Sequence, residues 1–286
     1  MVAAALERAH GWPEGSVVIL PVKTSGDRIQ DRPLAEVGGK ALWTKELDLA
    51  LLAGETDCSV HSMKDVESER PASLAIEAML ERADVRDRLI GAQSIAQLPK
   101  SAVVGTSSPR RAAQLKRLRP DLRTVSIRGN VDTRLAKLAA GEVDATLLAA
   151  AGLDRLGRGD VGVSIEVDQM LPAPAQGAIG VECRADDVMT AALLRAIDHL
   201  STHETVLAER AFCRALGGTC HSPVAAYARV NGDEIDLACE ILSEDGSQRI
   251  ADRTRFPVGD QETPINMARR MLAQSPPAIR RLFEGE

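Results

Sequence analysis

Hydrophobic and polar residues follow alternating strand-like and helix-like patterns along the middle of the chain. Residues 101–105, 124–127 and 145–151 are short runs of Val, Ile, Leu and Ala, which are typical of buried strands. Between them, residues 109–118 and 131–140 repeat apolar side chains at helical spacing. This series predicts an α/β fold with a parallel sheet and right-handed crossovers.

The pattern before this series is less regular. The first residues predict the last turns of a helix that ends at Gly11, and the β-branched run 16–22 predicts a strand. Residues 41–54 predict a helix with a glycine cap, because apolar residues recur at helical spacing up to Gly54. Residues 57–66 predict a short buried strand that runs into a loop.

The pattern after the series predicts a small α+β domain. Two helices are expected at about 187–199 and 203–215, and a last helix from about residue 262. Between them lie three apolar-polar runs that predict antiparallel strands. We expect two-residue turns at Asn231-Gly232 and Asp245-Gly246, since these dipeptides tolerate positive φ angles.

The chain length predicts about two domains, to which a small third is often added, and the changes of pattern divide the chain into three parts. At 286 residues, the chain exceeds what one core usually holds. Residues 171–183 mix prolines with small residues, which is typical of a crossing between domains. We assign residues 1–77 and 178–196 to the first domain, 78–177 to the second and 197–286 to the third.

Composition excludes several classes of protein. No run of about 18 apolar residues and no export signal occur, so we expect a cytoplasmic protein without a membrane partner. The five cysteines are irregularly spaced, which argues against a disulfide framework or a structural zinc site. A net charge of −6 argues against nucleic-acid binding.

Positive charge is nevertheless concentrated at the ends of the predicted parallel strands. Ligands of open α/β sheets bind at the carboxyl ends of the strands, so these loops should converge on one site for an anionic ligand. A capped helix with solvated arginines is an equally good explanation for the loop of residues 105–111 taken alone, but the same chemistry at the next strand end argues against it. The side chains in question are those of Thr106, Ser107, Ser108, Arg110, Arg111, Arg128, Asn130, Arg134 and Arg155.

Two further segments carry candidate chemistry. The predicted strand 57–66 ends with Ser62, Lys64 and Asp65, and Asp65 could transfer protons and stabilise a cation. An adjacent lysine and aspartate, such as Lys64 and Asp65, more often lie on the solvated surface. Cys220 lies in a glycine-rich loop, where its thiol could act as a nucleophile, although a lone cysteine is more often a buried apolar residue.

One histidine pair has the spacing of metal ligands. His199 and His203 lie four positions apart, but we expect a helix break at Ser201-Thr202 and see no third ligand. We therefore predict no metal site.

Seven segments, in the same order, are similar to the porphobilinogen deaminase family. The resemblance runs from about residue 16 to the C-terminus, and its serial motifs are specific. The segments are VGGKALWTKELDLALL, DCSVHSMKDV, GTSSPRRAAQL, SIRGNVDTRLAKL, AAGLDRLG, PAPAQGAIGVECR and LGGTCHSPVAAYA.

The resemblance implies a fold and an activity. The fold comprises two α/β domains like type II periplasmic binding proteins with a cleft between them, and a small α+β third domain with a three-stranded antiparallel sheet. The implied activity is that of a hydroxymethylbilane synthase, a transferase of tetrapyrrole biosynthesis. It deaminates and condenses four porphobilinogen molecules on a covalent dipyrromethane and then releases hydroxymethylbilane by hydrolysis. The family resemblance also implies a monomer.

The resemblance also implies roles for individual residues. Cys220 would hold the dipyrromethane through a thioether, and Asp65 would be the catalytic carboxylate that contacts the pyrrole nitrogens. Asn130 and Gln176 lie in or near the motifs of the same cleft. The positions that would bind acetate and propionate groups are Lys40, Ser62, Lys64, Thr106, Ser107, Ser108, Arg110, Arg111, Arg128, Arg134 and Arg155.

Two features depart from the family pattern. The family begins with a strand and a Thr-Arg-x-Ser-x-Leu-Ala motif, and this chain starts after it, roughly 20 residues short, which should expose a sheet edge and remove ligand contacts. Glu36 stands where many relatives have lysine. Two alternatives therefore remain: a truncated inactive deaminase, and a non-catalytic anion-binding protein of the same architecture.

Overall fold

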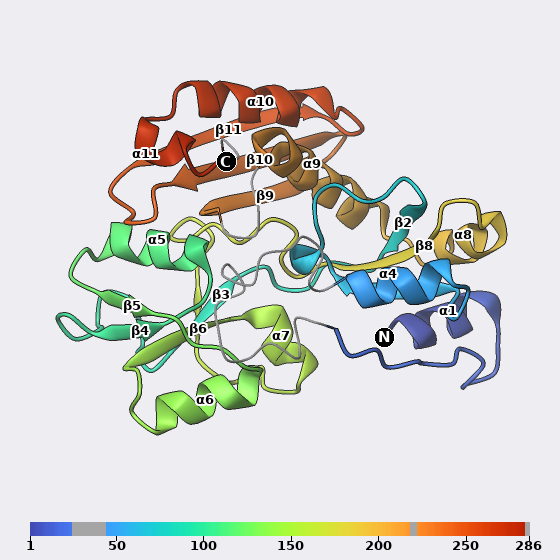
Figure 1. Cartoon of the computed structure of the whole chain (residues 1–286), viewed down its shortest axis with the longest axis horizontal. Coiled ribbons are helices and arrows are strands. Elements are labelled where there is room, and N and C mark those ends of the chain that lie inside the picture. Colours follow the sequence, from blue (N-terminus) through green and yellow to red (C-terminus); the bar gives the residue numbers. More distant parts are fainter. Residues whose placement is uncertain (25–43, 218–221, 284–286) are drawn as a thin grey trace. The chain divides into compact units, whose positions relative to one another are not determined.

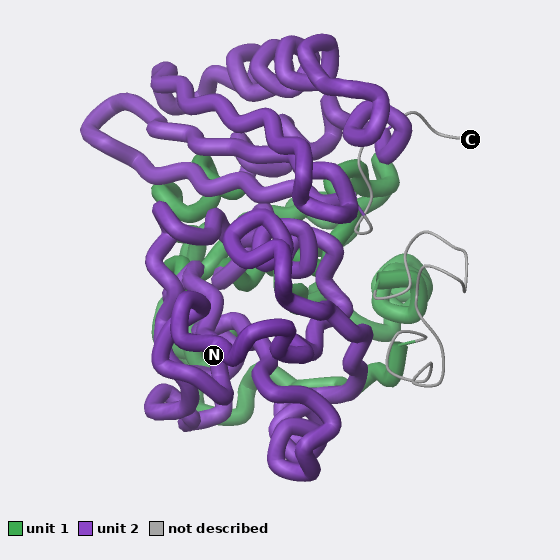
Figure 2. Tube along the Cα trace, turned by 90° about the vertical axis from the view of Figure 1, so that its left-hand side faces the viewer, with its two compact units in different colours: residues 1–83, 178–206 green, residues 84–177, 207–286 purple. Residues whose placement is uncertain are grey.

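The chain folds into two compact units, each with its own core. A computed structural model describes residues 1–24, 44–217 and 222–283 (Figure 1). Unit 1 comprises Met1–Ala83 and Ala178–Val206, and unit 2 comprises Asp84–Gly177 and Leu207–Glu286 (Figure 2). Within the described residues, none of the helices has the length and apolar character needed to span a membrane.

Unit 1 is built on a three-stranded antiparallel sheet in the order β1-β8-β2. Its core contains Val2 and Leu6 from the first helix, Val181 and Cys183 from the central strand, and Leu194. Its elements are α1 (Val2–His10), α4 (Lys45–Leu52), β1 (Cys58–Ser62), the 3-10 helix η1 (Met63–Asp65), β2 (Leu74–Met79), β8 (Ile179–Arg184), α8 (Val188–Arg195) and the first residues of α9 (Leu200–Leu216).

The predicted strand at residues 16–22 is wrong. The segment is irregular, and none of the described strands pairs with it. Val17 packs against the core of unit 1, but Val18 is 86% exposed and Ile19 76% exposed. A β-branched run favours extended backbone, but a strand also needs a neighbour for its backbone hydrogen bonds. The predictions of α1, α4 and β1 are confirmed within the described residues.

Unit 2 contains a five-stranded mixed sheet in the order β5-β4-β6-β3-β7. β4 runs parallel to β5 and β6, as the strand-helix pattern predicts, whereas β3 is antiparallel to both β6 and β7. The elements are β3 (Asp87–Ile90), β4 (Val103–Gly105), α5 (Pro109–Leu118), β5 (Arg123–Val125), α6 (Val131–Ala139), β6 (Ala145–Ala149), α7 (Ala150–Arg155) and β7 (Val163–Ile165).

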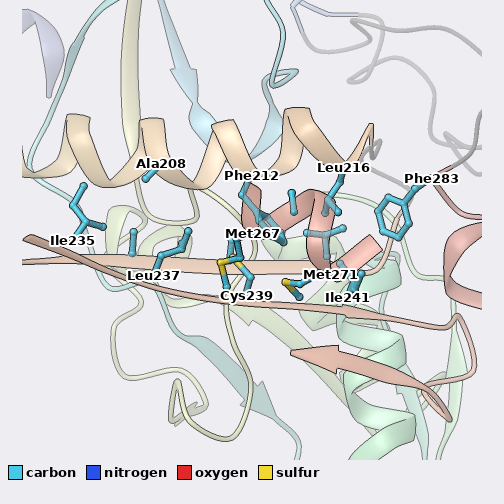
Figure 3. Packing of buried hydrophobic residues seen from close by; sticks show 14 of the residues in the cluster. Ala208, Phe212, Leu216, Ile235, Leu237, Cys239, Ile241, Met267, Met271 and Phe283 are labelled. Carbon is cyan, nitrogen blue, oxygen red and sulfur yellow. The ribbon is translucent and has the colours of Figure 1, made fainter. Parts of the chain in front are cut away.

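The rest of unit 2 is the predicted antiparallel sheet with its helices. The strand order is β11-β10-β9, and one apolar cluster joins the sheet to the helices; Phe212, Leu216, Met267 and Met271 belong to it (Figure 3). The elements are β9 (Val224–Asn231), β10 (Glu234–Leu242), β11 (Arg249–Pro257), α9 from Leu207 onward, α10 (Glu262–Ala273) and α11 (Pro277–Arg280). The predicted α/β class with this three-stranded sheet is confirmed.

The two turns of this sheet differ from each other. Asn231 pairs with Glu234, so the first turn has two residues, but they are Gly232 and Asp233. The two-residue turn predicted at Asp245-Gly246 is wrong, because Leu242 pairs with Arg249 and residues 243–248 form a longer loop. The Asp245 carboxylate accepts hydrogen bonds from the backbone and hydroxyl of Ser247, which stabilises the longer loop.

The longer loop packs closely on α5. A Cβ atom at Gly246 would lie 2.2 Å from the Ala113 carbonyl oxygen and 2.8 Å from the Arg117 nitrogen. Gly246 therefore lets the antiparallel sheet contact the helix that follows β4.

Gly246→Ala should destabilise unit 2 more than Gly232→Ala. Both glycines have a positive φ angle, of 70° and 65°, but nothing lies within 4 Å of a Cβ at Gly232. We expect Gly246→Ala to lower the free energy of unfolding by about 1–3 kcal/mol more than Gly232→Ala does. This difference reports the clash of the added Cβ with α5. Equal losses in chemical denaturation of the two variants would contradict this packing.

Candidate functional site

Lys64 and Asp65 project from a short turn at the end of β1 in unit 1. The Met63 N–H donates to the Ala178 carbonyl at 3.1 Å, and the Met63 side chain is buried. A Cβ at Gly180 would lie 2.2 Å from the Met63 sulfur, so the glycine makes room for this anchor. The side chains of Lys64 and Asp65 are both exposed.

Asp65 and Ser62 line a pocket of about 170 Å³ in unit 1. His61 lines the same pocket, and its Nε2 donates to Glu182 Oε2 at 3.0 Å. Burial alone would raise the pKa of Glu182, but hydrogen bonds from His61 and Arg70 lower it to about 2. The carboxylate beneath the turn is therefore ionised at neutral pH.

In unit 2, the ends of β4 and β5 bring two of the predicted loops together. The Thr106 N–H donates to the Val125 carbonyl at 2.8 Å, and the Ser107 hydroxyl donates to the Ile127 carbonyl. Ser108 caps α5, because its hydroxyl oxygen accepts from the Arg111 N–H at 3.4 Å. Hydroxyl groups of the first loop thus lie beside the chain that leads to Arg128.

The second loop is a capped helix start. Asn130 Oδ1 accepts from the N–H and the hydroxyl of Thr133, each at 2.9 Å. Arg134 Nε donates to the Gly129 carbonyl at 3.0 Å, which holds its side chain toward the loop. Gly129 has a φ of 108°, and a Cβ there would lie 2.5 Å from the Thr133 side chain, so only glycine fits.

Arg110 and Arg111 are both buried and share one carboxylate, that of Asp87 at the start of β3. Arg110 Nη2 lies 2.8 Å from Asp87 Oδ2, and Arg111 Nη2 lies 2.7 Å from Asp87 Oδ1. Gln176 Nε2 donates to Asp87 Oδ1 at 3.0 Å and to the Val85 carbonyl at 2.7 Å. Three residues predicted to bind ligand therefore meet at one buried acid.

Asp87 keeps its charge in this environment. Burial would raise the pKa of the Asp87 carboxyl, but the charges of Arg110 and Arg111 hold it well below its usual range. The sequence analysis missed Asp87, since it stands among Asp84, Arg86 and Arg88 and resembles a solvated surface run. Its position as the first residue of a buried strand was the available signal.

The cluster extends to the antiparallel sheet of the same unit. Arg110 Nη1 donates to Gln114 Oε1 and to the Leu171 carbonyl, both at 2.8 Å. Gln114 also donates to Glu240 of β10, which pairs with Arg249 at 2.6 Å. Three cations, Arg110, Arg111 and Arg249, thus face two carboxylates, Asp87 and Glu240, which leaves an excess of one positive charge.

The remaining predicted residues are less closely grouped. Residues 152–155 were expected in a loop but belong to α7, and the exposed Arg155 donates from Nη2 to the Gly177 carbonyl at 2.8 Å. Lys40 and Cys220 lie outside the described residues, as does Glu36.

The histidine pair is occupied by local contacts. His199 Nδ1 accepts from the Thr202 N–H at the start of α9, and His203 pairs with Asp198 at 2.8 Å. The helix break lies between Arg195 and Leu200 instead of at Ser201-Thr202. Over residues 1–24, 44–217 and 222–283, no group of three or more His, Cys, Asp or Glu side chains is arranged to hold a metal.

The fold and these side chains define an α/β protein that presents cationic and hydroxyl groups at the ends of parallel strands. The profile of the "porphobilinogen deaminase, dipyromethane cofactor binding domain" matches residues 1–192, and that of the "porphobilinogen deaminase, C-terminal domain" matches residues 203–273. The chain belongs to the porphobilinogen deaminase family.

Individual relatives agree with this assignment. The chain is 59% identical to the porphobilinogen deaminase of Sphingopyxis alaskensis, over 99% of this chain and 91% of the relative. It is 51% identical to that of Paracoccus denitrificans, over 89% of this chain and 82% of the relative.

Among solved structures, a domain of Bordetella pertussis BvgS matches with a TM-score of 0.39 and 16% identity, over 73% of this chain and 81% of that chain.

Asp87→Asn should destabilise unit 2 strongly. Loss of the buried carboxylate leaves two guanidiniums without their shared partner, and removing one member of a buried ion pair costs about 3–5 kcal/mol. Asp168→Asn is the matched control, because Asp168 is 90% exposed in its pair with Arg253 and should contribute little. Similar unfolding free energies for the two variants would show that the Asp87 cluster is not a structural centre.

The stability of unit 1 should depend on pH through Glu182. Its pKa is lowered from 4.5 to about 2, so the carboxylate stabilises the folded state above about pH 4.5, and this contribution is lost as the pH falls toward 2. The difference in Tm between the unchanged chain and Glu182→Gln should therefore shrink on acidification. If calorimetry finds the same difference in Tm at pH 7 and at pH 3, the pairing of Glu182 with His61 and Arg70 is contradicted.

Proposed function

We propose that the chain is a hydroxymethylbilane synthase, which condenses four porphobilinogen molecules into hydroxymethylbilane. The family membership carries this proposal, since the matched regions include both the cofactor-binding and the C-terminal domain. An exposed carboxylate at Asp65 and a group of cationic strand ends in unit 2 support it. The two alternatives, a non-catalytic binding protein and an inactive deaminase, gain no support from these observations.

The strand ends of unit 2 suit a ligand rich in carboxylates. Each porphobilinogen carries an acetate and a propionate group, so a growing chain accumulates negative charge. Arg128 and Arg134 would bind such groups through their guanidinium donors, and Ser107 would do so once its hydroxyl turns from the Ile127 carbonyl to the ligand. Asp87 would hold Arg110 and Arg111 in place while their excess positive charge attracts the ligand. The other proposed ligand contacts are Lys40, Ser62, Lys64, Thr106, Ser108, Asn130, Arg155 and Gln176.

Asp65 would be the catalytic carboxylate. Porphobilinogen loses ammonia to give an electrophile with positive charge on the pyrrole system, and a nearby carboxylate stabilises that charge. The same acid can serve every cycle, because each added ring presents the same pyrrole N–H. The turn after β1 holds Asp65 on a buried anchor at Met63, which would keep the carboxylate in one position.

Cys220 would attach the dipyrromethane cofactor through a thioether. When bound, that group supplies the pyrrole carbon to which the first substrate is joined. Burial raises the pKa of the four other thiols, those of Cys58, Cys183, Cys213 and Cys239. The pKa reaches about 11 for Cys183 and about 12 for Cys213. They would contain little thiolate at neutral pH, which favours Cys220 as the nucleophile.

We further propose the setting in which this chemistry takes place. Residues 1–77 and 178–196 would form the first domain, 78–177 the second and 197–286 the third. We propose a cytoplasmic monomer that binds neither nucleic acid nor membrane, consistent with the net charge of −6.

Incubation with porphobilinogen followed by mass spectrometry tests the proposed function. We expect hydroxymethylbilane as product and a dipyrromethane adduct on the peptide that contains Cys220. Cys213→Ser is a control that should keep the adduct, because the Cys213 thiol is largely protonated. An unmodified and inactive protein would overturn the assignment.

Asp65→Asn should abolish turnover without unfolding the chain. Asp65 is exposed, so its carboxylate contributes little to stability, whereas the amide cannot stabilise positive charge on the pyrrole. Loss of a transition-state interaction of this kind lowers kcat by roughly 100- to 1,000-fold. Near-normal product formation at an unchanged Tm would contradict the assigned role.

A further inference from the structure

The turn that carries Lys64 and Asp65 is tied to the same carboxylate on both sides. His61 precedes the turn and approaches Glu182 Oε2 through Nε2 at 3.0 Å. Arg70 follows the turn and donates from Nε to Glu182 Oε1 at 2.8 Å and from Nη2 to Oε2 at 2.9 Å. The central strand β8 thus binds the chain before and after Asp65.

The ties to Glu182 are shielded from water. The side chains of Glu182, His61 and Arg70 are 0%, 3% and 8% exposed. A bidentate arginine–carboxylate pair has a fixed geometry, because two parallel hydrogen bonds set both distance and orientation.

Arg70 also connects the turn to α4 and to its own loop. Its guanidinium lies 2.5 Å from Asp48 Oδ1 and 3.1 Å from Glu67 Oε2, and it donates to the Thr44 hydroxyl at 3.2 Å. All three guanidinium nitrogens are therefore engaged. Burial raises the pKa of Asp48, against the opposing hydrogen bond and charge of Arg70, and the charge of Glu182 adds to the rise.

Stability alone does not explain such a cluster. Replacing a buried ion pair by apolar residues is often neutral or stabilising, because the desolvation cost offsets the attraction. What the charged pair adds is a defined geometry for the segments it joins. The segment joined most directly here is residues 62–69, which contains the exposed Asp65.

We propose that Glu182 is a positioning residue for Asp65. It fixes the position of the Asp65 segment through its contacts with His61 and Arg70. This inference rests on the proposed catalytic role of Asp65. A displacement of about 1 Å in a reacting group can lower a rate roughly 100-fold, so a change at Glu182 should affect catalysis even though Glu182 is buried away from solvent.

Glu182→Gln keeps the shape of the side chain and removes its charge. We expect kcat to fall roughly 10- to 100-fold, with KM changing by less than about threefold, because the variant misplaces a group that acts in the transition state. Arg70→Lys keeps a positive charge and loses the bidentate fork, so it should give a smaller loss of kcat. It also provides a milder variant if Glu182→Gln does not fold.

Glu77→Gln is the matched control. Glu77 lies on β2 of the same sheet and pairs at 2.8 Å with Arg195, whose side chain is 62% exposed. Loss of this surface pair should leave kcat unchanged. A fall in kcat equal to that of Glu182→Gln would overturn the proposal, since any charge loss in the sheet would then suffice.

Amide hydrogen exchange gives a readout that does not depend on activity. The Met63 N–H, bonded to Ala178, should exchange at least tenfold faster in Glu182→Gln and Arg70→Lys, while the amides of β10 in unit 2 stay protected. Unchanged protection of Met63 would refute the positioning role, as would a normal kcat in both variants. An unchanged chain that makes no hydroxymethylbilane would instead refute the proposed function, and exchange at Met63 would still decide the role of Glu182.

Discussion

Burying a guanidinium is costly unless hydrogen bonds and opposite charge compensate for it, and a buried carboxylate provides this compensation in each unit of the protein. Asp87 holds Arg110 and Arg111 in unit 2, and Glu182 holds Arg70 in unit 1. In both cases hydrogen bonds and opposite charge outweigh the cost of burial and lower the pKa of the acid. Each ion cluster includes residues that border, in the sequence, a segment with exposed polar side chains.

The two clusters suggest different tasks. In unit 2, the arginines outnumber the carboxylates, and the excess positive charge suits the binding of acetate and propionate groups. In unit 1, carboxylates outnumber the arginine, and the cluster suits the placement of one acid, Asp65, which we propose acts on a cationic pyrrole. A protein with a net charge of −6 can thus bind a polyanionic product chain through local positive charge.

Sequence patterns predicted the parallel strands, α5, α6 and the antiparallel sheet, because each depends on local periodicity and caps. They failed at residues 16–22, where apolar character does not supply a pairing partner, and at Asp245-Gly246, where side-chain hydrogen bonds lengthen the turn. The candidate residues at strand ends were predictable from the α/β rule. Asp87 and Glu182 were not, since their partners lie 23 or more and 112 or more positions away and no local pattern marks such a pair.

The most direct test of the account is a crystal structure of the chain after incubation with porphobilinogen. We expect a dipyrromethane joined to Cys220, with Asp65 within hydrogen-bond distance of its pyrrole nitrogens and its carboxylates on the arginines and hydroxyls at the strand ends of unit 2. Asp87 and Glu182 should keep the partners described above. A cofactor bound away from Asp65, or carboxylates that contact none of those strand ends, would contradict the account.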